Sequence, residues 1–556
     1  MAHHGWVPVV GADAFTPQAL VSPFGRLFSA HAHEYSSYCL SMLAGALGPM
    51  QEAEPAPAQP TAQTNPAGFT FLGQFVDHDL TEFRVVAEDF AIAHENPTIS
   101  RRQRVLEDTP LAADGLRSMT TTNGRTGRLD LDSVYGLLGT PQADLFDEHG
   151  MFRLVDTPDG PDLERGKQHA NGRLIADPRN DENKLVVQVH MLFERLHNLL
   201  HQAHASEPPE QAGPTGPLFR QTKDAVVAAY QRIVIHDYLP RIVQAEHIDA
   251  VLAALADRTT CYQRMNARCR AALTGLGMPD DVVDATVAMP VEFSHAVFRL
   301  GHSQLRDGYL LRSGAGARLF ATSDDPHDLR GNSSLTGGDG FDFHVDWKHF
   351  FRITGTVPQH GRRIDGMLPR SVFRLPPPSI GEPPVSLAER NLRRGVDFGL
   401  PTGQEAAAEL ATVYGYVPQV GSDVLFPADV FGSRPEVLDL AAHLQWQTPL
   451  WYYVLKEAEA FGGGPQLGAV GGLIVAETIL GSIVESRLQA AAAAPGPGGF
   501  DREAETVAVV AEIQAERVAL APDGTDKSSG PLRFTAPAMT SVDEIRTMSQ
   551  LARFVG

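Results

Sequence analysis

The feature that most constrains the fold is an apolar repeat in residues 184–203, KLVVQVHMLFERLHNLLHQA. Its apolar side chains recur every three or four residues, at Leu185, Val189, Leu192, Leu196 and Leu199. This spacing places them on one face of an α-helix, which therefore packs its apolar stripe against a core. Residues 224–243 and 435–461 have the same periodicity, whereas runs of alternating polarity bounded by hairpin turns are scarce. The sequence predicts a mainly α fold.

The most membrane-like segment is LGAVGGLIVAETILGSIV, residues 467–484. Glu477 and several glycines interrupt it, so we predict a buried core helix and no transmembrane segment. Proline, alanine and glycine are enriched at 51–66, 375–384 and 490–499, which we interpret as surface loops. We therefore expect an N-terminal extension, residues 1–64, that packs on or wraps a single catalytic domain, residues 65–556.

Charge and cysteine content narrow the partners and the compartment. A formal charge of −21 and a pI near 5.4 disfavour nucleic-acid binding. The three cysteines, Cys39, Cys261 and Cys269, lack CxxC spacing, which argues against a disulfide framework. The N-terminus has neither a basic start nor an uninterrupted apolar run. We expect a cytoplasmic protein, or one exported by a route without a classical signal peptide.

Two segments carry candidate catalytic side chains. In FLGQFVDHDL, Gln74 and His78 are four residues apart and share a helical face, so the imidazole can relay protons from an apolar wall. Alone, such a histidine is more often a core or capping residue. In LIADPRNDENKL, Asp177 can cap a helix on which Arg179 and Glu182 point together. The alternative there is an ordinary exposed ion pair.

Two further segments carry candidate ligand side chains. In HAVFRLGHSQLRDGYL, His295, Arg299 and His302 step along one predicted helical face, offering a metal-ligating histidine beside a cation. With 21 histidines in the chain, accidental spacing is the alternative. In AERNLRRGVDFGLPTGQ, Asn391 can accept a hydrogen bond from a ligating imidazole, or can simply cap a helix.

A fifth segment, TGRLDLDSVYG, gathers hard oxygen ligands in one short loop. Asp130 and Asp132 alternate with leucines, and Thr126 lies just upstream. Calcium prefers such oxygens, although the loop lacks the spacing of an EF-hand. The alternative is a solvated acidic turn.

Together and in this order, the five segments resemble the animal-type heme peroxidase superfamily, which contains mammalian myeloperoxidase-like enzymes and many bacterial relatives. The resemblance runs from about Phe69 to Gly403 and includes the HNLL and HDYLP segments between the motifs. It implies a large helical domain with heme buried between core helices. It also implies an enzyme that uses hydrogen peroxide, through a ferryl intermediate, to oxidise small electron donors such as bromide, iodide, thiocyanate or phenolic compounds.

The resemblance assigns a role to each matching residue. Gln74 and His78 match the distal glutamine and histidine, Arg179 the distal arginine, His302 the proximal iron ligand and Asn391 its hydrogen-bond partner. The remaining matches concern the cofactors. Asp77 and Glu182 match the carboxylates ester-linked to heme b, and Arg299 and Arg394 match the arginines that meet the propionates. The implied calcium ligands are Asp79, Thr126, the carbonyl of Arg128, Asp130 and Asp132.

Three departures from the mammalian pattern refine these expectations. Asn183 stands where the most specialised halide-oxidising member has a heme-bonded methionine, so we expect no sulfonium link and no strong chloride oxidation. Asp132 replaces a serine, which adds negative charge to the calcium loop and keeps cation binding. The mammalian disulfides have no counterpart among the three cysteines.

Three other functions compete with a peroxidase. Fatty-acid oxygenases of the same superfamily carry a radical-forming tyrosine three residues before the proximal histidine. Here that residue is Arg299, although other tyrosines such as Tyr309 are present. A non-catalytic heme-binding protein would be expected to lose His78 or Arg179. A nonheme metalloprotein using His295 and His302 would leave the order of the five segments unexplained.

Overall fold

The structure is a computed structural model. It describes residues 7–9, 22–28, 33, 35–46, 48–52, 64–86, 121–136, 143–169, 172–203, 207–275, 277–322, 326–353, 355–375, 386–427, 442, 444–495, 499–518, 542 and 545–555. Most of the predicted N-terminal extension lies outside these residues. So do residues 376–385, which make up almost all of the second proline-rich segment.

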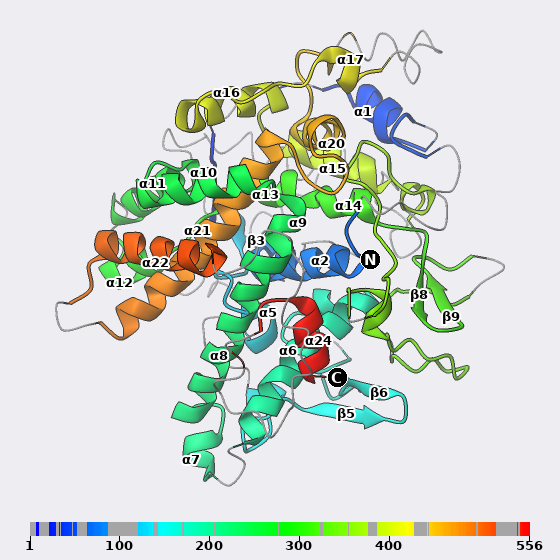
Figure 1. The fold of residues 1–556 in the computed structure, drawn as a ribbon, viewed down its shortest axis with the longest axis vertical. Coiled ribbons are helices and arrows are strands. Elements are labelled where there is room, and N and C mark those ends of the chain that lie inside the picture. Colours follow the sequence, from blue (N-terminus) through cyan, green and yellow to red (C-terminus); the bar gives the residue numbers. More distant parts are fainter. Residues whose placement is uncertain are drawn as a thin grey trace.

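The described chain is mainly α-helical, as predicted (Figure 1). The α-helices are α1 (Ser37–Ala44), α2 (Gly68–Leu80), α5 (Asp132–Tyr135), α6 (Lys184–Gln202), α7 (Pro209–Ala212), α8 (Pro217–Ile233), α9 (Leu239–Ile242), α10 (Ala245–Ala256), α11 (Cys261–Gly275), α12 (Asp280–Ala285), α13 (Val291–His295), α14 (Gly301–Gln304), α15 (Leu387–Asp397), α16 (Gly403–Tyr414), α17 (Ser422–Leu425), α20 (Leu450–Phe461), α21 (Ala469–Ala493), α22 (Arg502–Val518) and α24 (Met548–Val555). Short 3-10 helices are η4 (Ala143–Leu145), η5 (Pro178–Asp181), η7 (Val297–Leu300), η8 (Trp347–His349) and η9 (Arg370–Phe373), and η6 (Val234–Tyr238) is a π-helix.

The strands are few and short. A mixed sheet has the order β1-β3-β4-β2-β7 and comprises β1 (Val7–Val9), β3 (Phe83–Val86), β4 (Thr121–Asn123), β2 (Ser22–Gly25) and β7 (Met289–Pro290). The β1–β3 and β2–β7 pairs are parallel, and the other two pairs are antiparallel. Two separate hairpins are formed by β5 (Leu154–Thr157) with β6 (Gly160–Leu163) and by β8 (Gly308–Arg312) with β9 (Ala315–Arg318).

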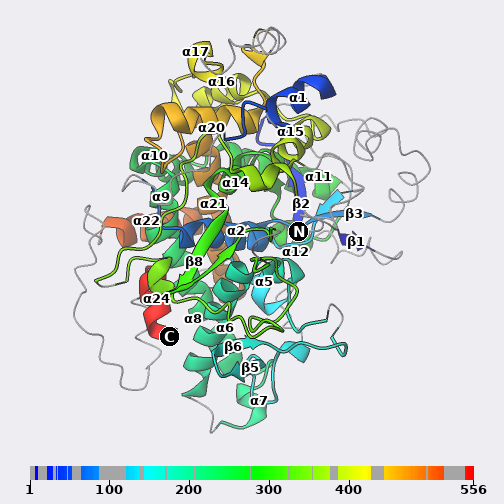
Figure 2. The same ribbon diagram turned by 90° about the vertical axis from the view of Figure 1, so that its right-hand side faces the viewer.

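Helix α2 lies at the centre of the molecule and packs against α5, α6, α14, η5 and η6 (Figures 1 and 2). Its apolar side chains explain this position, because Phe71, Phe75 and Val76 are fully buried. Phe75 stacks on Phe193 of α6 with ring centroids 5.2 Å apart. Gly73 is required where α2 meets η6, since a Cβ there would lie 2.5 Å from the hydroxyl of Tyr238.

Helix α21 is the predicted core helix of residues 467–484. Within the described residues it is the helix long and apolar enough to cross a membrane, yet 94% of its apolar window is buried inside the protein. Its buried carboxylate, Glu477, accepts hydrogen bonds from the backbone amides of Cys261 and Tyr262 at the start of α11 and from the hydroxyl of Tyr414. A satisfied carboxylate explains why this apolar helix tolerates a charge.

Two of the other helix predictions have different outcomes. Residues 224–242 are helical throughout, because α8 continues through the π-turn η6 into α9, and only Val243 is extended. The prediction of one helix over residues 435–461 is wrong where the structure describes it. Residues 445–449 are not helical, and α20 begins only after Pro449, whose ring cannot donate a helical hydrogen bond.

Candidate functional site

The site begins at the C-terminal end of α2, where the DHD triplet sends three side chains to different surroundings. His78 and Asp79 are at most 1% exposed. Asp77 lines a cavity and accepts a hydrogen bond from Oγ1 of Thr81 at 3.1 Å. The helix ends at Thr81, which has extended backbone angles and donates its amide hydrogen to the carbonyl of Asp77.

His78 is held as a neutral imidazole. Its Nδ1 lies 2.9 Å from Oδ1 of Asn180, an atom that only accepts hydrogen bonds, so Nδ1 carries the proton and Nε2 keeps a lone pair. Burial, reinforced by the nearby positive charge of Arg179, lowers the pKa of His78 to about 3. The ring is therefore uncharged at neutral pH, with the lone pair of Nε2 available.

Arg179 reaches the same place from η5, whose N-cap is Asp177, as the sequence predicts. The guanidinium donates to the carboxylate of Asp177 through Nε and Nη2, to the carbonyl of His78 through Nη2 and to the carbonyl of Thr81 through Nη1. Burial alone would lower the pKa of Arg179, but the carboxylate of Asp177 raises it. An arginine has five N–H groups, so this set uses four of them and leaves one N–H of Nη1.

The cavity that these groups share is small, with a volume of about 20 Å³, which is room for about one water molecule. Its walls bring together side chains from distant parts of the sequence. They are Phe24, Asp77, His78, Thr81, Phe83, Arg179, Ser294, His295, Arg299 and Arg394.

The second predicted histidine, His302, lies in the short helix α14 and contacts Asn391 of α15. The Asn391 amide nitrogen is 2.8 Å from Nδ1 of His302. The predicted pair is therefore in contact, but the amide nitrogen faces the ring, the reverse of the predicted direction. A half-turn of the amide would exchange its nitrogen for its oxygen. Burial, with the charges of Arg299 and Arg394, lowers the pKa of His302 to about 3 and keeps it neutral.

The predicted common helical face of His295, Arg299 and His302 is wrong. These residues lie in three short elements, α13, η7 and α14, because Ala296 leaves helical geometry at φ −134° and ψ −76°. The indole of Trp451 donates to the carbonyl of Arg299, a group that a continuous helix would use internally. His295 instead packs among Phe24, Phe83 and Phe398 in the cavity wall.

The donors and acceptors around the cavity fit a dianionic macrocycle. Arg299 and Arg394 bring two guanidinium groups to a buried wall whose carboxylate is Asp77. Nε of Arg299 is one of the buried donors without a hydrogen-bond partner among the described residues. Oε2 of Glu182 is likewise buried without a partner, but Glu182 lies outside the cavity lining. Burial raises the pKa of Asp77, and burial raises that of Glu182 to about 7. Propionates would compensate the arginines. An ester between a carboxylate and a heme methyl group would form by a two-electron oxidation, for which peroxide would be the oxidant.

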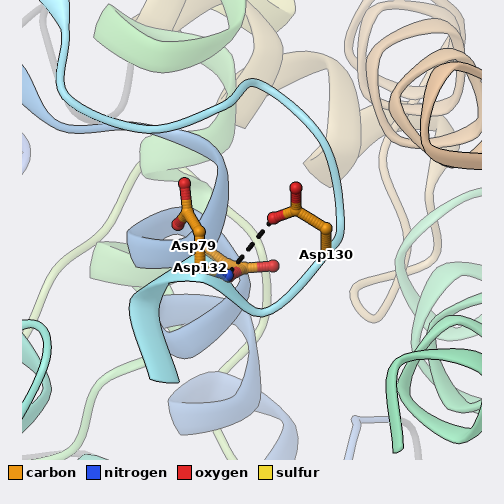
Figure 3. Close-up of side chains that lie close together, drawn as sticks. All are labelled: Asp79, Asp130 and Asp132. Atoms are coloured by element: carbon orange, nitrogen blue, oxygen red, sulfur yellow. Dashed lines mark hydrogen bonds between the residues drawn. The ribbon is translucent and has the colours of Figure 1, made fainter. Parts of the chain in front are cut away.

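A carboxylate cluster lies on the other side of the DHD triplet (Figure 3). Asp79 of α2 and Asp130 and Asp132 of the loop before α5 place carboxylate oxygens within 4.8 Å of one another. Oγ1 of Thr126 donates to Asp130 at 3.0 Å. Burial and the charge of Asp130 raise the pKa of Asp79 to about 7, a repulsion that a divalent cation would remove. Between the two loop aspartates, Leu131 has a left-handed φ of 58°, which is unusual for a bulky side chain.

A buried arginine connects this cluster to the cavity. Arg125 forms ion pairs with Asp132 at 3.4 Å, Glu82 at 3.2 Å and Asp177 at 2.7 Å. Because Asp177 also holds Arg179, the cation cluster and the cavity arginine share one network of buried charges.

The comparisons with known proteins identify the family of the chain. The sequence pattern of the animal haem peroxidase family matches residues 53–406, which include every predicted site residue. The chain belongs to the animal haem peroxidase family. No curated protein sequence matches it.

Solved structures show the fold of this family. Fatty acid α-dioxygenase of Arabidopsis thaliana has a TM-score of 0.51 and 13% identity, covering 93% of this chain and 74% of its own. Fatty acid α-dioxygenase of Oryza sativa, a variant with palmitic acid, has a TM-score of 0.51 and 14% identity, covering 96% and 80%. Peroxidase A of Dictyostelium discoideum has a TM-score of 0.49 and 16% identity, covering 90% of each chain.

Some residues of the site were predicted from the sequence, and others were not. Gln74 lies on α2 one turn before His78, half-buried and outside the cavity lining. Arg128 lies in the cation loop, where its amide donates to Thr126. Sequence reasoning missed Arg125 and Asn180, whose partners are remote in sequence. The only signal was that each lies within two residues of a predicted site residue.

Proposed function

We propose that the chain is a heme peroxidase that uses hydrogen peroxide to oxidise small electron donors. The observation that carries this proposal is the neutral imidazole of His78 beside the cation of Arg179 in one buried cavity. A base and a fixed cation at one site are the two groups that heterolysis of a peroxide bond needs.

In this proposal His302 would hold heme b through Nε2, with the Asn391 amide turned so that its oxygen accepts from Nδ1–H. Arg299 and Arg394 bind the propionates, and Asp77 and Glu182 are the ester-forming carboxyl groups. Bound heme supplies the iron that takes up peroxide and the oxidising equivalents that donors consume. Calcium is held by Asp79, Thr126, the carbonyl of Arg128, Asp130 and Asp132.

The side chains divide the proton and charge transfers between them. Nε2 of His78 would take the proton from one peroxide oxygen and return it to the other oxygen, which leaves as water when the O–O bond breaks. The remaining N–H of Arg179 stabilises negative charge on that departing oxygen. Because Asp177 and two backbone carbonyls hold the guanidinium, it does not have to reorganise during the reaction.

The donors that we propose are bromide, iodide, thiocyanate or phenolic compounds. Asn183, at the position of the heme-bonded methionine, caps α6 by accepting a hydrogen bond from the amide of Leu185 at 2.8 Å. An amide at this position cannot form a sulfonium link, so we do not expect strong chloride oxidation.

A fatty-acid oxygenase is the alternative within the family. The position three residues before His302 is Arg299, which cannot form a tyrosyl radical. The hydroxyl of Tyr309 is buried and accepts a hydrogen bond from the amide of Arg306. Arg299 therefore favours the peroxidase, and conversion of palmitate with molecular oxygen would favour the oxygenase.

The test is reconstitution of the full chain with heme. We expect a Soret band that shifts when hydrogen peroxide is added and that returns as iodide or a phenol is oxidised. An occupied heme that does not respond to peroxide would contradict the proposal. Mass spectrometry after peroxide treatment tests the esters, and we expect heme on peptides that contain Asp77 or Glu182.

A further inference from the structure

A buried chain of hydrogen bonds runs from His78 away from the cavity into α6. Oδ1 of Asn180 lies 2.9 Å from Nδ1 of His78, and Nδ2 of Asn180 lies 3.1 Å from Nδ1 of His190. Nε2 of His190 lies 3.0 Å from Oε1 of Glu194, one helical turn further along. None of the four side chains is more than 2% exposed, so solvent cannot replace any of these partners.

The donors and acceptors of this chain fix one another. The amide nitrogen of Asn180 only donates, so Nδ1 of His190 accepts from it and the ring proton of His190 lies on Nε2. That proton is donated to Oε1 of Glu194, and the amide orientation turns Oδ1 of Asn180 toward His78. The last link is therefore a donation from Nδ1–H of His78.

We propose that Glu194 and His190 act through Asn180 as positioning residues that hold His78 in the tautomer with a free lone pair on Nε2. The opposite arrangement, with every hydrogen bond reversed, needs a donor at position 194. It would turn the amide of Asn180 around and place a proton on the Nε2 of His78. An acceptor at position 194, three hydrogen bonds from the reacting ring, thus decides which ring nitrogen of His78 keeps its lone pair.

The effect of the His78 tautomer on the peroxide reaction rests on the proposed function, whereas the hydrogen-bond geometry does not. If only the Nδ1–H tautomer accepts a proton from peroxide, the rate constant for peroxide falls in proportion to the fraction of molecules in that tautomer. Asn180 touches His78 directly, whereas His190 and Glu194 act only by orienting the amide.

Nitrogen NMR of the histidine-labelled full chain reads the tautomer directly, both without heme and in the diamagnetic ferrous carbon monoxide complex. The His78→Gln variant assigns the ring signals of His78. In the wild-type chain we expect a single form protonated at Nδ1. In Glu194→Gln, whose amide can donate as well as accept, we expect loss of that single form. Glu457→Gln is the matched control, a buried glutamate outside this chain of hydrogen bonds, and should keep the wild-type signals.

Infrared spectra of the carbon monoxide complex provide a second measurement. An Nε2–H of His78 can donate to the bound ligand and lower its stretching frequency, so Glu194→Gln should gain a lower band that wild type and Glu457→Gln lack. A wild-type His78 protonated at Nε2, or a Glu194→Gln variant with unchanged signals, would overturn the inference. Failure to form a Soret band would count against the proposed function instead, because the measurement without heme still reads the tautomer.

Discussion

The site contains two histidine–asparagine pairs, His78 with Asn180 and His302 with Asn391, and the amide is oriented differently in each. On the distal side, defined by His78, Arg179 and Asn180, the amide is fixed from behind by His190. On the proximal side, defined by His302 and Asn391, the amide nitrogen faces the ring, and within the described part of the chain no hydrogen bond to the amide oxygen opposes a turn of this amide. The fold thus fixes the orientation of the Asn180 amide, whereas we expect bound heme to fix the orientation of the Asn391 amide.

Removing the distal base is expected to have the largest effect. His78→Ala should slow the reaction of bound heme with peroxide by about 10²- to 10⁴-fold, the usual contribution of a general acid–base group. Heme binding should persist because His302 is untouched. Stopped-flow spectra at equal heme occupancy measure the rate, and a His302→Ala control should lose heme instead. If the peroxide reaction of His78→Ala is as fast as that of the wild type, His78 is not the base and the distinction between the two histidines is wrong.

Changing the distal cation should cost less. Arg179→Lys keeps the charge but cannot span Asp177 and the two carbonyls at once, so we expect a loss of roughly 10²- to 10³-fold in the peroxide reaction. The affinity for the donor substrate should stay the same. Steady-state kinetics with iodide separate the two parameters. A loss confined to the KM for iodide would assign Arg179 to donor binding.

Loosening the proximal pair should have a smaller effect still. Asn391→Leu removes the partner of His302, and second-shell partners of metal-ligating histidines typically contribute about 10- to 100-fold in affinity or activity. We expect weaker heme retention during dialysis and little change in the initial peroxide reaction. If the peroxide reaction falls as far as in His78→Ala, the two sides are not independent.

The carboxylate cluster of Asp79, Asp130 and Asp132 should have the smallest effect. The direction of its pH dependence follows from the raised pKa of Asp79. Below pH 7 the carboxyl holds a proton that calcium must displace, so calcium affinity should fall by up to roughly tenfold per pH unit. The pKa of Asp79 in the folded protein lies above its value in the unfolded chain, near 3.9. The metal-free protein should therefore lose stability as the pH rises from about 4 to about 7. Calorimetric titration and thermal unfolding at several pH values measure both trends.

The sequence was sufficient where function depends on local spacing. The periodicity of α2 and α6 predicted both helices, and Asp177 and Pro178 marked the start of η5. It failed where tertiary contacts override local preference. HAVFRLGH has helical spacing, but the fold breaks it at Ala296 and uses the carbonyl of Arg299 to bind Trp451.

The contacts of Asn180 and Arg125, which connect the parts of the site, could not be predicted from the sequence either. Asn180 meets His78 across 102 positions, and Arg125 meets Asp177 only because α2, the cation loop and η5 converge. A polar residue next to a motif has many possible partners, and only the fold selects among them.

The most direct test of the account is the rate of the peroxide reaction of heme-loaded protein between pH 4 and pH 8. Since burial and Arg179 hold the pKa of His78 near 3, the base is neutral throughout this range. We predict a rapid Soret change whose second-order rate constant stays flat. The absence of any change, or a rate that falls tenfold per unit below about pH 6.5, the ordinary value for a histidine, would contradict the account.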